Sequence, residues 1–128
     1  MEHVTPDCPG IQWEPNGVVE PVLTVAGVTA RLRLGPHPDD SDQRAVILAF
    51  AGVCHASMGF PNDEGRPHHR LWRHGLCDIY WIGKVEGSRL IKAVNHASAR
   101  PSSLTHWVIL HKEDTVEVVA KSLEITRE

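Results

Sequence analysis

The side chains best suited to chemistry are concentrated between Cys54 and Cys77. This segment combines imidazoles, guanidinium groups and two adjacent carboxylates, which are His55, His68, His69 and His74, Arg66, Arg70 and Arg73, and Asp63 and Glu64. An imidazole near a carboxylate can act as a general acid or base, and guanidinium groups bind anions. The segment spells no complete catalytic motif. The sequence therefore locates a candidate site without naming its reaction.

An acid–base site in this segment would centre on His69. A carboxylate just upstream, from Asp63 or Glu64, would orient the imidazole and set its tautomer. On a helix, Arg73 would share a face with His69 because the two are four residues apart. The structural alternative is that Asn62 and the two acids cap the start of a helix and satisfy its backbone N–H groups. The sequence leaves open whether the protein is an enzyme.

A ligand-binding pocket is the related hypothesis. Arg66 and Arg73 would bind an anionic or polar molecule beside His69. Further candidate ligand-binding residues are Asn62, Trp72 and His106. Tryptophans usually pack in the core, so Trp72 would take this role only as part of an apolar pocket wall.

The spacing of the histidines and cysteines argues against a metal. Cys54 and His55 are adjacent on a predicted strand, so their side chains point to opposite faces. His68 and His69 are about 100° apart on a predicted helix. No HxxxH or CxxC motif holds two ligands on one face. We predict no metal and no cofactor, and we expect Cys54 and Cys77 to be buried free thiols. A nucleophilic pair of Cys54 with a histidine is the alternative.

Composition restricts the class of protein. The chain has 128 residues, enough for one compact domain. Its formal charge of −3 argues against binding to nucleic acid or anionic membranes, because both require an excess of Lys and Arg. Three cysteines form no paired disulfide framework. We find no signal-peptide pattern and no apolar run of membrane-spanning length, so we predict a cytoplasmic protein.

The predicted strands must position the polar segment. Residues 1–17 are rich in proline and predict an irregular arm, with Ile11 and Trp13 docked on a single domain of residues 18–128. Residues 18–34 and 104–125 should each form an antiparallel hairpin, because each holds two β-branched runs around a turn. The apolar run after Arg44 predicts a central strand, and residues 77–85 predict another.

Two helices complete the prediction. A short helix over residues 67–74 would begin at Pro67, where the missing N–H is harmless, and would end at Gly75 in a left-handed conformation. Ser88 would cap a longer helix over residues 88–98. Together these elements predict an α+β fold, a mainly antiparallel sheet of about five or six strands with one short and one longer helix. A small curved sheet or partly closed barrel is the alternative.

The polar segment also carries a motif. The residues Asn62, Asp63 and Glu64 are followed by His69, Leu71, Trp72, Gly75 and Leu76. This stretch resembles a widespread family of small bacterial proteins of unknown function. Their shared pattern is Asn-Asp-Glu, four residues, His-Pro-Leu-Tyr, two residues and Gly-Leu. Arg70 stands in place of the proline, and Trp72 in place of the tyrosine.

The resemblance extends roughly from Met58 to Leu123. Ser88 and Ile91 fit the Ser-x-x-Ile helix start of that family. Its terminal hairpin carries a His-aromatic pair and, on the second strand, Thr-x-Glu; these positions are matched by His106, Thr115 and Glu117, although Lys112 and Glu113 replace its His-Asp pair. The resemblance implies no particular activity.

Two classes of function fit these observations. The first is a small-ligand protein, with weak His-based acid–base catalysis as an extension. The second is a protein-interaction module of the accessory or immunity type. In the first class residues 62–74, which we call the polar loop, would cover the ligand, and in the second they would form the recognition surface. A pocket predicts inward-facing polar side chains with shifted pKa values, whereas a recognition surface predicts flat, exposed ones. The partner is therefore a small molecule or a protein, and a homodimer stays open.

Overall fold

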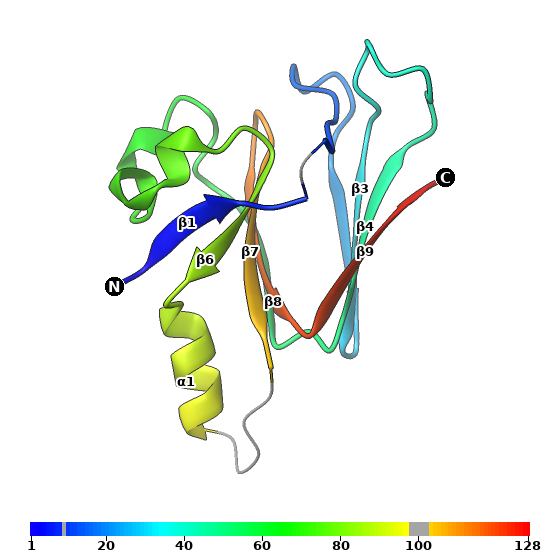
Figure 1. Ribbon diagram of the computed structural model, residues 1–128. Helices are drawn as coiled ribbons and strands as arrows, with labels where there is room; N and C mark the ends of the chain where they lie inside the picture. The colour runs from blue at the N-terminus through cyan, green and yellow to red at the C-terminus, as the bar shows by residue number, and fades with distance from the viewer. Residues whose placement is uncertain (9, 98–102) are drawn as a thin grey trace.

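The computed structural model describes residues 1–8, 10–97 and 103–128. These residues form nine β-strands in two antiparallel sheets, one α-helix and three short 3₁₀ turns (Figure 1). The predicted architecture, mainly antiparallel with few helices, is confirmed. The predicted single sheet of five or six strands is wrong, because the strands divide between two sheets, and neither sheet closes into a barrel.

The five-stranded sheet has the order β1–β6–β7–β8–β5. Its strands are β1 (His3–Pro6), β5 (His55–Gly59), β6 (Ile82–Glu86), β7 (Thr105–Leu110) and β8 (Thr115–Ala120). The N-terminal arm is thus not wholly irregular. Residues 3–6 pair with β6, which places Val4 opposite Val85 in a buried cluster. Further along the arm, Ile11 and Trp13 pack on the core as predicted.

The four-stranded sheet has the order β2–β3–β4–β9. Its strands are β2 (Val22–Ala26), β3 (Thr29–Leu34), β4 (Val46–Ala51) and β9 (Ser122–Arg127). The hairpin predicted for residues 18–34 is confirmed by β2 and β3, which turn at Gly27 with a φ of 60°. The predicted central strand is also confirmed, because β4 lies between β3 and β9.

Two connections between consecutive strands lead from one sheet to the other. β4 leads to β5 through residues 52–54, and β8 leads to β9 through Lys121. Since β4 pairs with β9 and β5 pairs with β8, the sheets share one corner and diverge from it (Figure 1). The hairpin predicted for residues 104–125 is therefore correct for β7 and β8 only. Its second run breaks at Lys121 and continues in the other sheet.

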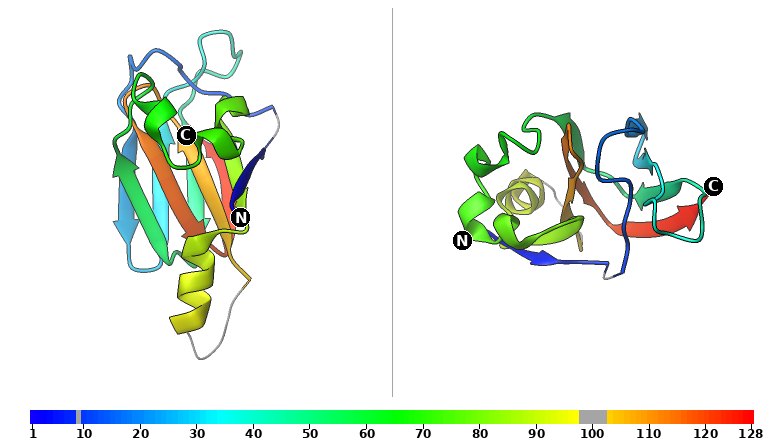
Figure 2. Two further views of the ribbon diagram at one scale, coloured as in Figure 1. Left: turned by 90° about the vertical axis from the view of Figure 1, so that its left-hand side faces the viewer. Right: turned by 90° about the horizontal axis from the view of Figure 1, so that it is seen from above.

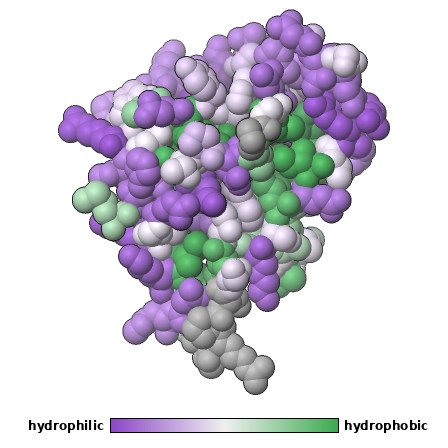
Figure 3. Space-filling model, in the orientation of Figure 1, coloured by the Kyte–Doolittle hydropathy of each residue, from purple (hydrophilic) through white to green (hydrophobic). Residues whose placement is uncertain are grey.

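The main core fills the space between the two sheets. Inward-facing residues alternate along β3, where Ala30, Leu32 and Leu34 are buried and the residues between them are exposed. They meet large side chains from the other segments, including Trp13, Phe50, Trp107 and Ile109. Hydrophobic atoms reach the surface between the N-terminal arm and β9 (Figure 3), where Cys8, Ile11, Leu123 and Ile125 line a shallow hollow.

A second buried cluster covers the outer face of the five-stranded sheet. Leu71, Leu76 and Ile79 pack there against Val4, Val85, Val108 and Leu110. The helix predicted for residues 67–74 is replaced by three 3₁₀ turns, at Arg66–His68, Trp72–His74 and Leu76–Asp78. We call residues 66–79 the turn segment.

The leucines explain the shape of the turn segment. On a continuous helix Leu71 and Leu76 would point about 140° apart. With His69 extended between two turns, both leucines reach the sheet and are 1% and 0% exposed. Gly75 adopts the predicted left-handed conformation, with a φ of 105°. A Cβ at this position would clash with the carbonyl of Val4.

The longer helix, α1 (Arg89–Ala97), lies on the same side of the five-stranded sheet as the turn segment, away from the four-stranded sheet (Figure 2). Ser88 caps it as predicted, since Oγ of Ser88 accepts a hydrogen bond from the backbone N–H of Ile91 (3.2 Å). Ser98, where the predicted helix ends, lies outside the described residues. β6 begins at Ile82, later than predicted. No described helix is long and apolar enough to cross a membrane.

Candidate functional site

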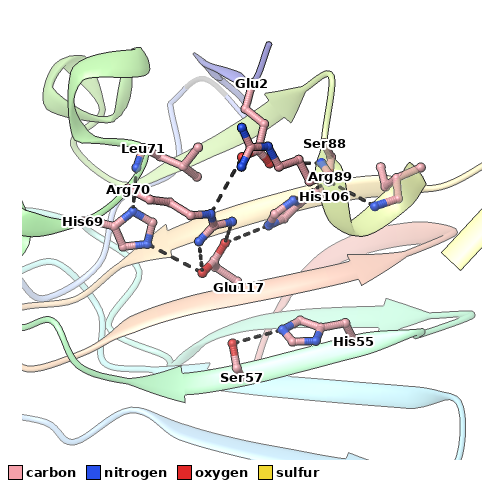
Figure 4. Close-up of polar contacts among 11 residues, drawn as sticks. Glu2, His55, Ser57, His69, Arg70, Leu71, Ser88, Arg89, His106 and Glu117 are labelled. Carbon is pink, nitrogen blue, oxygen red and sulfur yellow. Dashed lines mark hydrogen bonds and ion pairs between the residues drawn. The ribbon is translucent and has the colours of Figure 1, made fainter. Parts of the chain in front are cut away.

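A largely buried polar network lies on the outer face of the five-stranded sheet, with Glu117 of β8 at its centre (Figure 4). Arg70 donates two hydrogen bonds to the Glu117 carboxylate, at 2.8 and 3.1 Å. Nε2 of His106 lies 2.9 Å from Oε1, and Nε2 of His69 lies 3.6 Å from Oε2. We call these residues, with Ser88 behind His106, the Glu117 network.

Strand alternation places the network. Val116 and Val118 point into the main core, so Glu117 between them points outward. His106 on the neighbouring strand β7 faces outward for the same reason, because Trp107 points inward. His69 reaches the carboxylate from the turn segment. Only 14% of the Glu117 side chain and none of the His106 side chain is exposed.

The partners of each imidazole fix its protons. A carboxylate only accepts hydrogen bonds, so Nε2 of both His69 and His106 carries a proton. The backbone N–H of Leu71 donates to Nδ1 of His69 (3.0 Å), which leaves neither ring nitrogen free. Nδ1 of His106 lies 2.7 Å from Oγ of Ser88. That hydroxyl also accepts from the start of α1, and it can either donate to Nδ1 or accept from it.

The network holds Glu117 ionised. Burial raises the pKa of its carboxyl group, but hydrogen bonds from His106, His69 and Arg70, with the charge of Arg70, lower that pKa well below the usual value. The hydrogen bond to Glu117 in turn raises the pKa of Arg70. Both carboxylate oxygens are engaged. The network is therefore closed, and it ties the turn segment to the sheet.

The network also reaches the N-terminal segment. Glu2, which is 7% exposed, accepts a hydrogen bond from the backbone N–H of Arg89 at the start of α1 (3.1 Å). Nε of Arg70 lies 3.8 Å from the same carboxylate. Beside the network, His55 of β5 contacts Ser57 (3.2 Å), and Ser57 lies opposite Glu117 in the sheet.

The carboxylates predicted to orient His69 lie elsewhere. Asp63 and Glu64 are exposed, and neither is bonded to His69 among the described contacts. The first 3₁₀ turn also has no side-chain cap, so Asp63 does not take the capping role either. Glu117 makes the contact that the sequence assigned to these acids.

The other predicted site residues either make structural contacts or are exposed to solvent. Asn62 accepts a hydrogen bond from the backbone N–H of Gly65 (2.9 Å) within its own loop. Trp72 packs against the second buried cluster. Arg73 is exposed, and the predicted shared face with His69 is absent because no helix connects them. His106 lies in the Glu117 network rather than beside a cavity.

A pocket of about 360 Å³ lies beside the first 3₁₀ turn. It is lined by five aromatic rings, four charged side chains and two further residues, which are Trp13, His37, Tyr80, Trp81 and His111; Glu14, Asp63, Arg66 and Lys112; and Pro15 and Leu110. We call it the Arg66 pocket. Of the predicted site residues, it contains Arg66 and Asp63.

Arg66 and His111 are the pocket residues with a buried side-chain nitrogen that has no hydrogen-bond partner among the described residues. Nη2 of Arg66 donates to the backbone carbonyl of His111 (2.7 Å), but the buried Nε of Arg66 has no hydrogen-bond partner. None of the ion pairs within the described residues involves Arg66. Burial lowers the pKa of the guanidinium, and the Asp63 carboxylate opposes this shift. Asp63 therefore offsets only part of the desolvation cost of this partly buried cation.

The aromatic side of the pocket is held in place by its own contacts. The rings of Trp13 and Trp81 meet edge to face, with centroids 5.4 Å apart, and His37 meets Trp81 in the same way at 5.9 Å. Nε1 of Trp13 donates to the carbonyl of Leu110 (3.0 Å). Glu14 also lines the pocket, but its carboxylate accepts backbone N–H groups of its own loop.

The cysteines correct one expectation. Cys54 and Cys77 are exposed, not buried, because they lie in the link between β4 and β5 and in the last 3₁₀ turn. Cys8 is half-buried, and burial together with Asp7 raises the pKa of its thiol to about 11. Within residues 1–8, 10–97 and 103–128, no three His, Cys, Asp or Glu side chains are grouped to hold a metal ion.

Sequence reasoning missed most of the Arg66 pocket, because its lining comes from separate segments that carry no shared motif. Glu117 had one signal. It is the only charged residue in the β-branched run of β8, where an isolated acid indicates a buried or paired carboxylate.

Comparison with protein-family models, curated proteins and solved structures gives no match for this chain. The family resemblance therefore stays a prediction. Four residues that carry it, namely His69, Ser88, His106 and Glu117, meet in the Glu117 network.

Proposed function

We propose that this protein binds a small anionic molecule in the Arg66 pocket. The observation that carries the proposal is the state of Arg66, a partly buried guanidinium with a buried N–H that has no acceptor and with no ion-pair partner. An anion beside the guanidinium would supply a compensating charge and would accept hydrogen bonds from its accessible N–H groups. Charge-assisted hydrogen bonds of this kind are the strong ones in proteins.

The shape of the pocket supports small-molecule binding. Its volume of about 360 Å³ falls in the range of small-ligand sites, roughly 300–1,000 Å³. Such sites combine apolar and aromatic walls with a few polar groups that fix orientation. Here Trp13 and Trp81 supply the wall and Arg66 supplies the polar group.

The Glu117 network supports the proposal from a distance. Glu117 binds Arg70 through two hydrogen bonds, and the neighbouring Leu71 is buried in the second cluster. Arg66 stands at the start of this fixed segment, and its guanidinium is held by the carbonyl of His111, so it loses little freedom when a ligand binds. The acid–base extension has no such support, because both ring nitrogens of His69 are engaged.

The test is a titration of the purified protein with acetate, benzoate, sulfate and inorganic phosphate, followed by NMR chemical shifts of the tryptophan indole N–H groups. We expect at least one anion to bind saturably and to bind at least tenfold more weakly to Arg66→Ala. Arg73→Ala is the matched control, since Arg73 is an exposed arginine of the same turn segment outside the pocket. Absence of binding, or equal binding by Arg66→Ala, would contradict the proposal.

One observation favours a protein-interaction module as the second candidate. Phe60, two residues before the polar loop, is 82% exposed, and aromatic residues are enriched in protein–protein interfaces. This candidate predicts that Phe60→Ser abolishes capture of a protein partner and leaves anion binding unchanged. If Phe60→Ser captures the same partner equally well, this surface is not the interaction site.

A further inference from the structure

We infer that the ligand of the Arg66 pocket is an aromatic carboxylate, a single ring that carries one carboxylate group. This inference rests on the proposed function and narrows it to a class of molecule. The carboxylate would lie on the guanidinium of Arg66, and the ring would lie against Trp13, His37 and Trp81.

The charges of the pocket favour a monoanion. Its two permanent cations, Arg66 and Lys112, are accompanied by two carboxylates, Asp63 and Glu14. Asp63 lies close enough to Arg66 to act on its pKa. A dianion such as phosphate would be repelled by these carboxylates more strongly than a monoanion.

The donors of Arg66 favour a carboxylate among monoanions. A guanidinium presents five N–H donors in a planar fork that matches the two oxygens of a carboxylate. One of these donors is used by the carbonyl of His111. Nε is buried and Nη1 makes no hydrogen bond among the described residues, so the N–H groups of Nη1 are the ones available to a ligand oxygen.

The aromatic wall and the size of the pocket favour a ring. Trp13 and His37 already meet Trp81 at interplanar angles of 73° and 83°, the edge-to-face geometry that aromatic groups prefer. Tyr80, which is 84% exposed, adds a further ring at the same pocket. A pocket of about 360 Å³ is near the lower end of the small-ligand range, which favours one ring over a nucleotide.

The experiment compares four probes on the full chain, again by NMR of the indole N–H groups. The probes are benzoate, its saturated analogue cyclohexanecarboxylate, its neutral analogue benzamide, and inorganic phosphate. We expect benzoate to bind about three- to tenfold more tightly than cyclohexanecarboxylate. We expect benzamide and phosphate each to bind at least tenfold more weakly than benzoate.

Two kinds of variant separate the contributions. Arg66→Ala should remove the preference for benzoate over benzamide. Trp81→Leu should remove the preference for benzoate over cyclohexanecarboxylate while keeping the preference for benzoate over benzamide. His37→Leu is the second wall variant, because His37 lies in a loop and its replacement does not disturb the core.

The outcomes distinguish this inference from the proposed function. If benzoate and cyclohexanecarboxylate bind equally and both depend on Arg66, the aromatic class is overturned and anion binding stands. If phosphate binds more tightly than benzoate, the carboxylate class is overturned. If none of the probes binds, both the inference and the proposed function fail.

Discussion

Arg70 and Glu117 form a two-point ion pair between residues 47 positions apart in the chain, with N–O distances of 2.8 and 3.1 Å. The same carboxylate contacts two imidazoles, one of them fully buried. This carboxylate is therefore the point at which the turn segment is fastened to the sheet. Removing the carboxylate should therefore lower the free energy of unfolding.

Glu117→Ala should lower the free energy of unfolding by about 3 kcal/mol, because it leaves the Arg70 and His106 side chains without their acceptor. Glu124→Ala is the control, since Glu124 is an exposed glutamate on strand β9 and should change stability by less than about 0.5 kcal/mol. Urea unfolding measures both. A loss below about 1 kcal/mol for Glu117→Ala would show that the network contributes little.

Acid should weaken the protein through the same residue. The pKa of Glu117 is lowered in the folded state, so its contribution is fully present above the unfolded pKa of about 4.3 and is lost as pH falls below it. Glu117→Gln cannot titrate, and its unfolding free energy should decline less between about pH 5 and pH 3. Unfolding curves at several pH values test this. Parallel declines in both proteins would contradict it.

His69 and Asp63 should differ in how much each contributes to stability. His69 is 7% exposed in its side chain and accepts the backbone N–H of Leu71, so His69→Ala should cost about 1–3 kcal/mol. Asp63 is exposed and caps no turn, so Asp63→Ala should cost less than about 0.5 kcal/mol. Thermal melts of the two variants decide the order, and a larger loss for Asp63→Ala would refute it.

The three thiols should react at different rates. Cys54 and Cys77 are exposed, whereas Cys8 is half-buried with a pKa of about 11. Because the thiolate is the reactive form, alkylation at pH 8 should label Cys8 at least about tenfold more slowly than the other two. Mass spectrometry of peptides after timed labelling gives the rates. Equal labelling of all three cysteines would mean that Cys8 is more accessible than its position indicates.

The elements that the sequence predicted well are those specified by local pattern. The alternation in β3 and the turn at Gly27 define a hairpin within a few residues. The corner at Lys121 was missed because the run around it looks continuous. The local sign of the corner is that the inward-facing positions change from even to odd numbers. Val116 and Val118 of β8 face the core, whereas Leu123 and Ile125 face it in β9.

For the candidate sites too, the sequence predicted only what a local pattern specifies. The polar loop drew attention to His69 and Arg66, and the structure assigns them to two separate clusters. No local pattern could pair Arg66 with Trp13 or His37, because they are brought together only when the sheets have formed. The predicted helix over residues 67–74 failed for a related reason, since the burial of Leu71 and Leu76 determines the backbone there.

The shared corner also determines when the chain can fold during synthesis. β4 has its final partner only when β9 is present, and β5 has its final partner only when β8 is present. Neither sheet can be completed until residues 115–127 have left the ribosome. Until then, apolar strands such as Val46–Ala51 must remain partly uncovered, at the stage when nascent chains are most prone to aggregate.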